Sequence, residues 1–258
     1  MKKTPKPWRK VTEHKMIAWF LVCMAASPLV DFASDEGIAR LERSQHKIDF
    51  FHLANQFESQ SNKFFCGATS AAIVLNTLRP DAANKPQDPS LLDAAGRRVV
   101  PKGIDPLFSR YTQNNAFKGP KTRLQALGQH ATGAPPDIGL QLRQLQALLV
   151  ANGLNVQLRI VDDTLPTAQI KKELVDNLGR ANDYVLVNYD RQTLGQVGGG
   201  HISPLAAYDK ASDSFLIMDV NPNKAGFVWV PADLLIAAMH TYDTVENRGF
   251  LLLSEGTQ

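Results

Sequence analysis

One cysteine, Cys66, lies where an irregular loop meets the run 67–78, which has helical spacing and is apolar almost all round. A helix without a polar face is a buried helix. Its first turn offers unpaired backbone N–H groups and the positive end of the helix dipole, and both favour a thiolate over a thiol. The sequence therefore predicts Cys66 as a nucleophile. The alternative is a small apolar core residue, as most free cysteines are.

A thiolate nucleophile needs a base, and the base needs an orienting group. His201 follows the glycines 198–200, which let backbone and substrate approach closely, and it opens a predicted strand. Asp219 lies in the apolar run 215–220, where an unpaired charge is costly. A hydrogen bond to His201 would pair Asp219 and fix the imidazole tautomer. The alternatives are an incidental histidine in a tight hairpin and an aspartate that caps the turn at Asn221.

The elements that must position these residues divide into a helical first half and a strand-rich second half. Helical patterns occur at 34–44, 49–56, 66–78, 91–99, 121–130, 137–153, 167–178 and 232–240. Strand patterns occur at 154–160, 184–189, 203–208, 214–220, 227–230 and 249–254. This segregation predicts an α+β fold, with the central helix that starts at Cys66 packed on a mainly antiparallel sheet. The order cysteine, histidine, aspartate and the long first gap match papain-like cysteine proteases, although the papain local signature is absent.

The charge of the chain is unevenly distributed. Hydrophobic residues make up 44% and charged residues 21%, which is ordinary for a globular protein. The formal net charge is +3, but six of the 28 basic residues and only one of the 25 acidic residues lie within the first 26 positions. The remaining chain is slightly acidic, which gives no electrostatic basis for binding nucleic acid.

The basic tail precedes an apolar run, 16–26, that is too short to span a bilayer and is followed by small residues. Residues 1–33 are therefore predicted to be a secretory signal peptide, with an uncleaved membrane anchor as the alternative, and 34–258 to be one catalytic domain. Export to a bacterial periplasm would leave Cys66 as a lone thiol, a liability there unless it does chemistry. No metal site is predicted, because the histidines and cysteines lack metal-ligand spacing.

Three long motifs carry a family resemblance: Gln60-Ser61-x-x-Phe64-Phe65-Cys66-Gly67-Ala68, Gly199-Gly200-His201-Ile202-Ser203-Pro204 and Phe215-Leu216-Ile217-Met218-Asp219-Val220. Shorter ones are Ser34-x-Glu36-Gly37, Tyr111-Thr112-Gln113-x-Asn115-x-Phe117 and Arg248-Gly249-Phe250. Together they resemble the papain-like catalytic domain of phytochelatin synthases over about residues 34–254. The match is closest to the short prokaryotic members that lack a cysteine-rich C-terminal half.

The resemblance implies a reaction and a role for each site residue. Cys66 would attack the Cys–Gly amide of glutathione and release glycine, leaving a γ-Glu-Cys thioester. His201 would act as base and then acid, and Asp219 would orient it. Gln60 is similar to the family's oxyanion-hole glutamine. Asp243 and Arg248 stand where the family holds the amino and carboxylate groups of the γ-glutamyl moiety, two residues closer together than in the family pattern.

One departure from the family bears on the acceptor of the acyl group. The family has a basic, aromatic and proline-rich run after the catalytic aspartate, whereas this chain has Pro222-Asn223-Lys224-Ala225-Gly226-Phe227. Lys224 remains, and with Asp243, Arg248 and Gly200 it completes the predicted substrate-binding set. Since that run is associated with acceptor binding, we expect hydrolysis to γ-glutamylcysteine, with little or no transfer to a second glutathione.

The resemblance also bears on cofactors and partners. It implies no cofactor, with heavy-metal ions entering only as metal–thiolate complexes of the substrate. The expected partners are glutathione and related γ-glutamyl thiol peptides, and a second copy of the chain in a homodimer. Two other functions stay open: a general papain-like periplasmic peptidase, and a non-catalytic thiol- or metal-binding module.

Overall fold

A single antiparallel sheet of seven strands, in the order β1-β6-β5-β4-β3-β7-β2, organises the protein. The computed structural model describes residue 1, residues 28–81 and residues 83–256. The strands are β1 Val30–Asp31, β2 Leu154–Ile160, β3 Asp183–Asp190, β4 Gly200–Asp209, β5 Ser214–Ile217, β6 Val228–Pro231 and β7 Gly249–Glu255. The helices are α1 Asp35–Arg43, α2 Ile48–Ala54, α3 Cys66–Leu78, α4 Ala94–Val99, α5 Arg123–Ala126, α6 Leu142–Ala151, α7 Thr167–Leu178 and α8 Ala232–Met239, with a 3₁₀ turn at Pro89–Leu91. The predicted α+β fold is confirmed.

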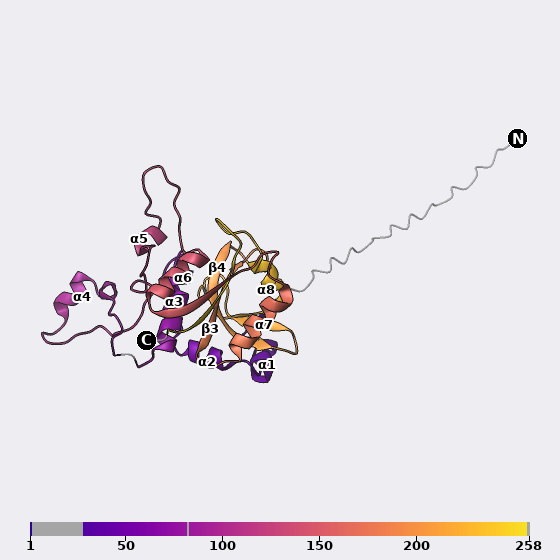
Figure 1. Cartoon of the computed structure of the whole chain (residues 1–258), viewed down its shortest axis with the longest axis horizontal. Coiled ribbons are helices and arrows are strands. Elements are labelled where there is room, and N and C mark those ends of the chain that lie inside the picture. The colour runs from indigo at the N-terminus through magenta and orange to yellow at the C-terminus, as the bar shows by residue number, and fades with distance from the viewer. Residues whose placement is uncertain (2–27, 82, 257–258) are drawn as a thin grey trace.

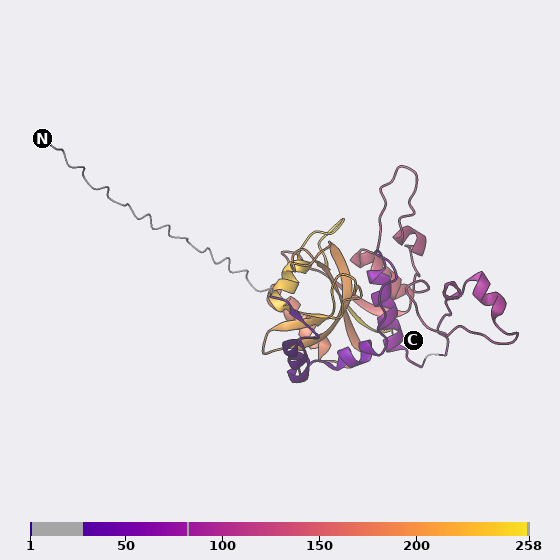
Figure 2. The same ribbon diagram turned by 180° about the vertical axis from the view of Figure 1, so that it is seen from behind.

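The sheet separates two hydrophobic cores. α3 and α6 lie on one side of β3 and β4, and α7 and α8 on the other, as both views show (Figure 1, Figure 2). Strand β3 serves both cores, because Leu186 packs towards α3 while Val185 and Val187 pack towards α7 and α8. The central strands are therefore covered on both faces, which explains their nearly continuous apolar sequences.

Helix α3 is as buried as its sequence predicts. Every residue from Gly67 to Asn76 is buried, and the alanines among them allow close packing against β4. Gly67 illustrates how close this packing is: a Cβ there would meet Leu140 at 3.3 Å and Ile202 at 3.4 Å. The start of α3 is thus pressed against the strand that carries His201.

Several predicted elements are shorter in the structure, and the helix predicted at 121–130 is shortened most, to Arg123–Ala126. α6 begins at Leu142 rather than near 137, because Gly139 has a φ of +71° and Gln141 forms a capping box with Gln144. β5 ends at Ile217, so Asp219 follows the strand instead of lying within it. The Asn221 N–H donates to Asp219 Oδ1 at 2.8 Å and closes the turn. The turn-capping alternative is therefore also realised.

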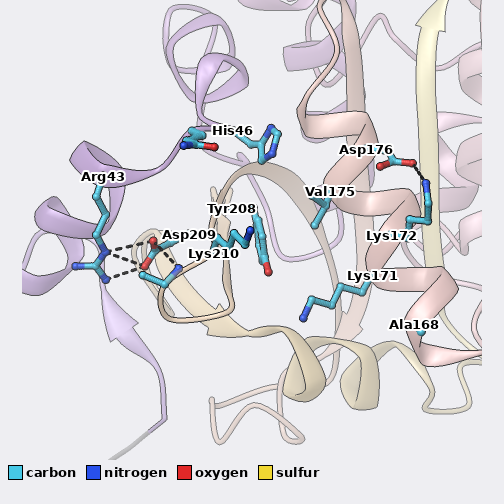
Figure 3. Close-up of a pocket in the computed structure, with 12 residues that line it drawn as sticks. Arg43, His46, Ala168, Lys171, Lys172, Val175, Asp176, Tyr208, Asp209 and Lys210 are labelled. Atoms are coloured by element: carbon cyan, nitrogen blue, oxygen red, sulfur yellow. Dashed lines mark hydrogen bonds and ion pairs between the residues drawn. The ribbon is translucent and has the colours of Figure 1, made fainter.

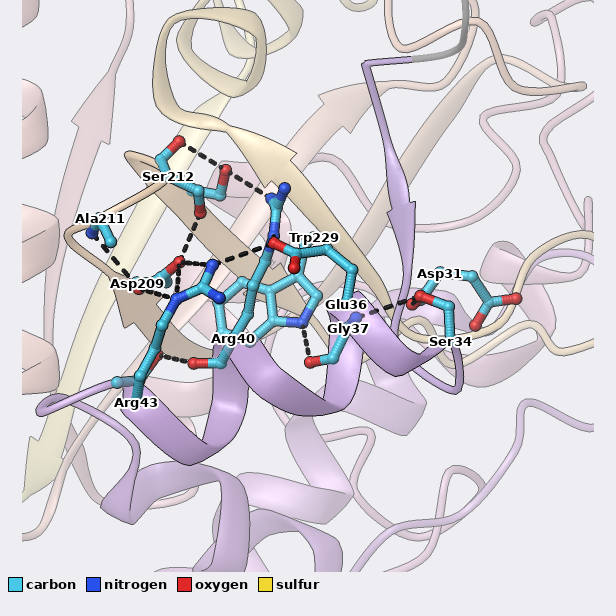
Figure 4. A network of polar contacts seen from close by, with 12 residues as sticks. Asp31, Ser34, Glu36, Gly37, Arg40, Arg43, Asp209, Ala211, Ser212 and Trp229 are labelled. Carbon is cyan, nitrogen blue, oxygen red and sulfur yellow. Dashed lines mark hydrogen bonds and ion pairs between the residues drawn. The ribbon is translucent and has the colours of Figure 1, made fainter.

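The motif at Ser34–Gly37 is structural. Ser34 Oγ accepts from the Gly37 N–H at 3.1 Å and caps α1. A Cβ on Gly37 would lie 2.0 Å from the Asp31 carbonyl oxygen, and the Gly37 carbonyl accepts from buried Trp229 at 2.9 Å. Arg43 adds an ion pair to Asp209 at 2.7 Å (Figure 4). These contacts dock α1 on the sheet.

The folded part begins before residue 34, the boundary that the sequence suggested. Val30 and Asp31 form strand β1 and pair with Trp229 and Val228. A strand of two residues is too short to show a periodic pattern in the sequence. The predicted leader otherwise falls on residues 2–27, outside the described residues. Among the helices that the structure does describe, none is long and apolar enough to cross a membrane.

Candidate active site

Cys66 is the first residue of α3 and is partly exposed. Its N-cap, Phe65, makes no side-chain cap, so the first N–H groups of the helix stay available. Burial raises the pKa of the Cys66 thiol. The hydrogen bond to His201, the charge of His201 and the backbone N–H groups of Ile202 and Gly67 lower this pKa, and together they outweigh the effect of burial. The net effect is a pKa below the ordinary value, as expected for a nucleophilic thiolate.

His201 is the second residue of β4 and only 4% exposed. Its Nε2 lies 2.9 Å from Asp219 Oδ1, which leaves Nδ1 as the ring nitrogen for the Cys66 sulfur. Burial lowers the pKa of His201, but the hydrogen bonds to Asp219 and Cys66 outweigh it and the net pKa is raised. The lowered thiol pKa and the raised imidazole pKa both favour a thiolate–imidazolium pair over the neutral pair.

Asp219 is fully buried and has a second cationic partner that is not among the residues predicted from the sequence. Arg191 Nη2 lies 2.6 Å from Asp219 Oδ2, and both side chains are almost inaccessible. Burial raises the pKa of Asp219, but its bond to His201 and the charges of His201 and Arg191 lower it overall. The Tyr189 hydroxyl also donates to Oδ2, at 3.3 Å. One sequence signal existed: an aspartate in an apolar run needs a counter-charge, and Arg191 directly precedes the glycine-rich loop.

The four charges of this cluster alternate in sign. Cys66 and Asp219 are negative in the ion-pair state, while His201 and Arg191 are positive, so the buried cluster is neutral. The backbone of Arg191 makes two hydrogen bonds to the glycine-rich loop 195–200. The Gln196 N–H donates to the Arg191 carbonyl at 2.8 Å, and the Arg191 N–H donates to the Gly199 carbonyl at 3.1 Å. Arg191 therefore links the carboxylate to the backbone that leads into His201.

Gln60 lies in the loop before α3 and is 8% exposed. Its backbone N–H donates to Val220, the residue after Asp219, at 2.8 Å. Its side-chain Nε2 donates to the Asn62 carbonyl at 2.7 Å, which uses one of two N–H bonds. The second N–H remains for a ligand. Gln60 Oε1 is buried without a partner among the described residues.

The predicted substrate-binding residues gather around the backbone that precedes His201. A Cβ on Gly200 would meet Arg248 Nη2 at 2.9 Å, so the guanidinium lies directly over this glycine. Arg248 also pairs with Asp243 at 3.3 Å, and its Nε is buried without a partner in the described part of the chain. Lys224 is exposed and its ammonium lies against Gly198. All four residues thus border the same glycine-rich segment.

A sizeable cavity lies away from this chemistry. It has a volume of about 730 Å³ and is lined by the α1–α2 connection, α7 and the far end of β4, including His46, Lys171 and Tyr208 (Figure 3). None of the predicted site residues lines it. His201 and Tyr208 stand near opposite ends of β4, so this cavity is separate from the thiol. In the described ranges, no group of three or more histidine, cysteine, aspartate or glutamate side chains could hold a metal ion.

Comparison with known proteins identifies the family. The phytochelatin synthase family model matches residues 22–90 and 105–250. The chain belongs to the phytochelatin synthase family. The family model omits 91–104, a segment that contains α4, none of whose residues is buried.

The relatives include glutathione gamma-glutamylcysteinyltransferase 2 of Arabidopsis thaliana, 29% identical over 239 residues, which cover 88% of this chain and 45% of the relative. The glutathione gamma-glutamylcysteinyltransferase of Schizosaccharomyces pombe is 25% identical over 207 residues, covering 80% and 43%. The chain thus spans less than half the length of these relatives. Among solved structures, the cysteine protease xylellain from Xylella fastidiosa matches with a TM-score of 0.39 and 14% identity, covering 85% of this chain and 89% of xylellain.

Proposed function

We propose that the protein cleaves the Cys–Gly amide of glutathione through a thioester on Cys66. The observation that carries the proposal is the array Cys66–His201–Asp219, in which His201 hydrogen-bonds to Asp219 and lowers the pKa of Cys66. Membership of the phytochelatin synthase family supplies the substrate, since its relatives are named as glutathione gamma-glutamylcysteinyltransferases.

The reaction follows from the positions of the groups. The Cys66 thiolate attacks the amide carbonyl carbon, and His201 gives its proton to the glycine nitrogen as the C–N bond breaks. Water then attacks the thioester, His201 takes the proton of this water, and the C–S bond breaks to restore the thiolate. The free N–H of Gln60 and the Cys66 backbone N–H stabilise the oxyanion, at about 3 kcal/mol per donor.

Recognition of the γ-glutamyl end is assigned to Arg248 and Asp243. Their opposite charges suit the carboxylate and ammonium groups of a γ-glutamyl residue. The Nε of Arg248 supplies a donor that no group in the described part of the chain accepts from. Because Arg248 lies over Gly200, a γ-glutamyl group held there stands one residue from His201.

Water is the proposed acceptor. The loop after Asp219 consists of exposed residues, Pro222, Asn223 and Lys224, whose turn is held by backbone bonds from Lys224 and Ala225 to Asn221. The exposed part of this loop offers one ammonium for a second glutathione and no aromatic ring, because the ring of Phe227 packs against Phe57 and Phe32. Hydrolysis to γ-glutamylcysteine and glycine should therefore exceed transfer.

Incubation with glutathione, followed by mass spectrometry of glycine, γ-glutamylcysteine and longer oligomers, tests the proposal. We expect equal amounts of glycine and γ-glutamylcysteine from the wild type and none from Cys66→Ala. Cleavage of peptides without a γ-linked glutamate would indicate a general peptidase. Absence of Cys66-dependent glycine release would indicate a non-catalytic binding module. Abundant oligomers on addition of cadmium would overturn the preference for water, and would show a metal–thiolate complex acting as substrate.

Export to the periplasm and a homodimer are also proposed. The basic tail and apolar run of residues 1–26 support export. Fusion of residues 1–35 to a reporter that is active only after export measures this directly: a signal is expected, and reporter retained in the cytoplasm would contradict it. Light scattering on the purified protein, with the mass of two chains expected, tests the dimer.

A further inference from the structure

Gln113 makes three side-chain hydrogen bonds around the predicted oxyanion-hole loop. Its Oε1 accepts from the Ser61 N–H at 2.6 Å and from the Thr69 hydroxyl at 3.1 Å. Its Nε2 donates to the Ser59 carbonyl at 3.1 Å. Gln113 is only 9% exposed, so water does not compete strongly for these bonds. The amide therefore holds the backbone on both sides of Gln60.

The same amide is tied to the helix of the nucleophile. Thr69 is fully buried in the first turn of α3, and its N–H donates to the Phe65 carbonyl at 2.8 Å. Through Thr69, Gln113 joins the start of this helix to the loop of Gln60. The two oxyanion donors, the Gln60 amide and the Cys66 N–H, come from these two segments.

We propose that Gln113 is a positioning residue that sets the separation of the Gln60 amide and the Cys66 N–H, and thereby the oxyanion hole. In the described structure Gln60 makes two other hydrogen bonds, from its N–H to Val220 and from its side chain to Asn62, and neither reaches α3. Phe65 adds no side-chain cap at the start of that helix. The proposal rests on the proposed function, which supplies the oxyanion.

The rate depends on how precisely the two oxyanion donors are placed. A displacement of about 1 Å in a catalytic group reduces the rate by as much as about 100-fold. Since Gln113 touches no reacting atom, its removal should act on kcat, where oxyanion stabilisation appears, and leave KM nearly unchanged. A purely structural role would instead lower the amount of folded protein without changing kcat per folded molecule.

A double-mutant cycle tests this. Gln113→Met keeps the volume and removes the three bonds, and we expect kcat for glycine release to fall about 10- to 100-fold. In a Gln60→Ala background the same change should cause no further loss, because the donor that Gln113 positions is already gone. Thr69→Val, an isosteric change that cuts only the link to α3, should give a smaller loss in kcat and keeps the test open if Gln113→Met does not fold.

Asn76→Leu is the matched control. Asn76 is 2% exposed and also makes two hydrogen bonds to the backbone, at Tyr111, but it does not touch the Gln60 loop. It should lower the thermal midpoint to a similar degree and leave kcat near the wild-type value. Equal kcat losses for Gln113→Met and Asn76→Leu, or full additivity with Gln60→Ala, would overturn the proposal. Absence of Cys66-dependent glycine release in the wild type would instead remove the proposed function and this inference together.

Discussion

The ion pair of Arg191 with the buried carboxylate of Asp219 is expected to stabilise the folded protein. Arg191→Met measures this contribution to the free energy of unfolding. Arg191 Nη2 lies 2.6 Å from Asp219 Oδ2, with side-chain exposures of 2% and 0%. Opposite unit charges about 4 Å apart attract by about 4 kcal/mol at an effective dielectric constant of about 20. Removing one partner of a buried pair typically costs about 3–5 kcal/mol. The two values agree, so we expect a loss of about 4 kcal/mol in the free energy of unfolding.

Urea unfolding is the assay. With an m-value of about 2–3 kcal/mol/M, the midpoint should fall by about 1–2 M. Arg143→Met is the matched control, since Arg143 lies 2.6 Å from Glu246 but is itself exposed, and it should cost less than about 1 kcal/mol. In an Asp219→Asn background, Arg191→Met should lower the free energy of unfolding much less.

A loss below about 1 kcal/mol for Arg191→Met, or the same loss with and without Asp219→Asn, would refute the charge-pairing argument. A second readout follows from the neutrality of the cluster. Removing the Arg191 charge makes the Cys66 thiolate less favourable and should raise the pKa of Cys66. Alkylation of Cys66 by iodoacetamide, followed against pH, should then need a higher pH than in the wild type.

Three further predictions concern other parts of the chain. Burial raises the pKa of Asp49 to about 8 from 3.8, so the folded protein loses stability as pH rises from about 4 to 8, by up to about 1.4 kcal/mol per pH unit. Asp49→Asn should therefore be neutral at pH 4 and raise the free energy of unfolding by several kcal/mol at pH 8. An equal effect of this substitution at both pH values would contradict the prediction. Gly37→Ala forces a Cβ to within 2.0 Å of the Asp31 carbonyl oxygen, so thermal unfolding should show a markedly lower midpoint, whereas an unchanged midpoint would mean that α1 docks loosely. Arg248→Gln should lower kcat/KM for glutathione about 10- to 100-fold, the value of a hydrogen bond to a charged group, and unchanged kinetics would exclude Arg248 from substrate binding.

The spacing of apolar residues is sufficient to predict an element when one buried face determines which of its residues are apolar. The helix Thr167–Leu178 was predicted with its observed bounds because its apolar face recurs at helical spacing and Gly179 ends it. The pairing of His201 with Asp219 was also foreseen, since a carboxylate in an apolar run requires a partner. The structure brings Cys66, His201 and Asp219 together and ties the backbone of Gln60 to Val220, beside Asp219. The catalytic roles of these residues stay predictions.

The sequence could not reveal contacts that depend on tertiary structure. Gln113 lies within the motif at 111–117, but neither that motif nor the surroundings of Arg191 name a partner, because Ser61 and Asp219 lie more than twenty positions away in sequence. The start of α6 was placed too early, since Ile138 and Leu140 fit the helical spacing while Gly139 adopts a left-handed conformation that breaks it. Strand β1 was assigned to the leader because two residues are too few to show alternation.

The central claim is that Cys66 becomes acylated by substrate. Rapid acid quenching of the enzyme during turnover with glutathione, followed by intact-mass and peptide mass spectrometry, tests it most directly. The account predicts a γ-glutamylcysteinyl group on Cys66, formed together with one equivalent of glycine and absent in His201→Ala. Glycine release by an enzyme that never carries this group, or acylation at any other residue, would contradict it.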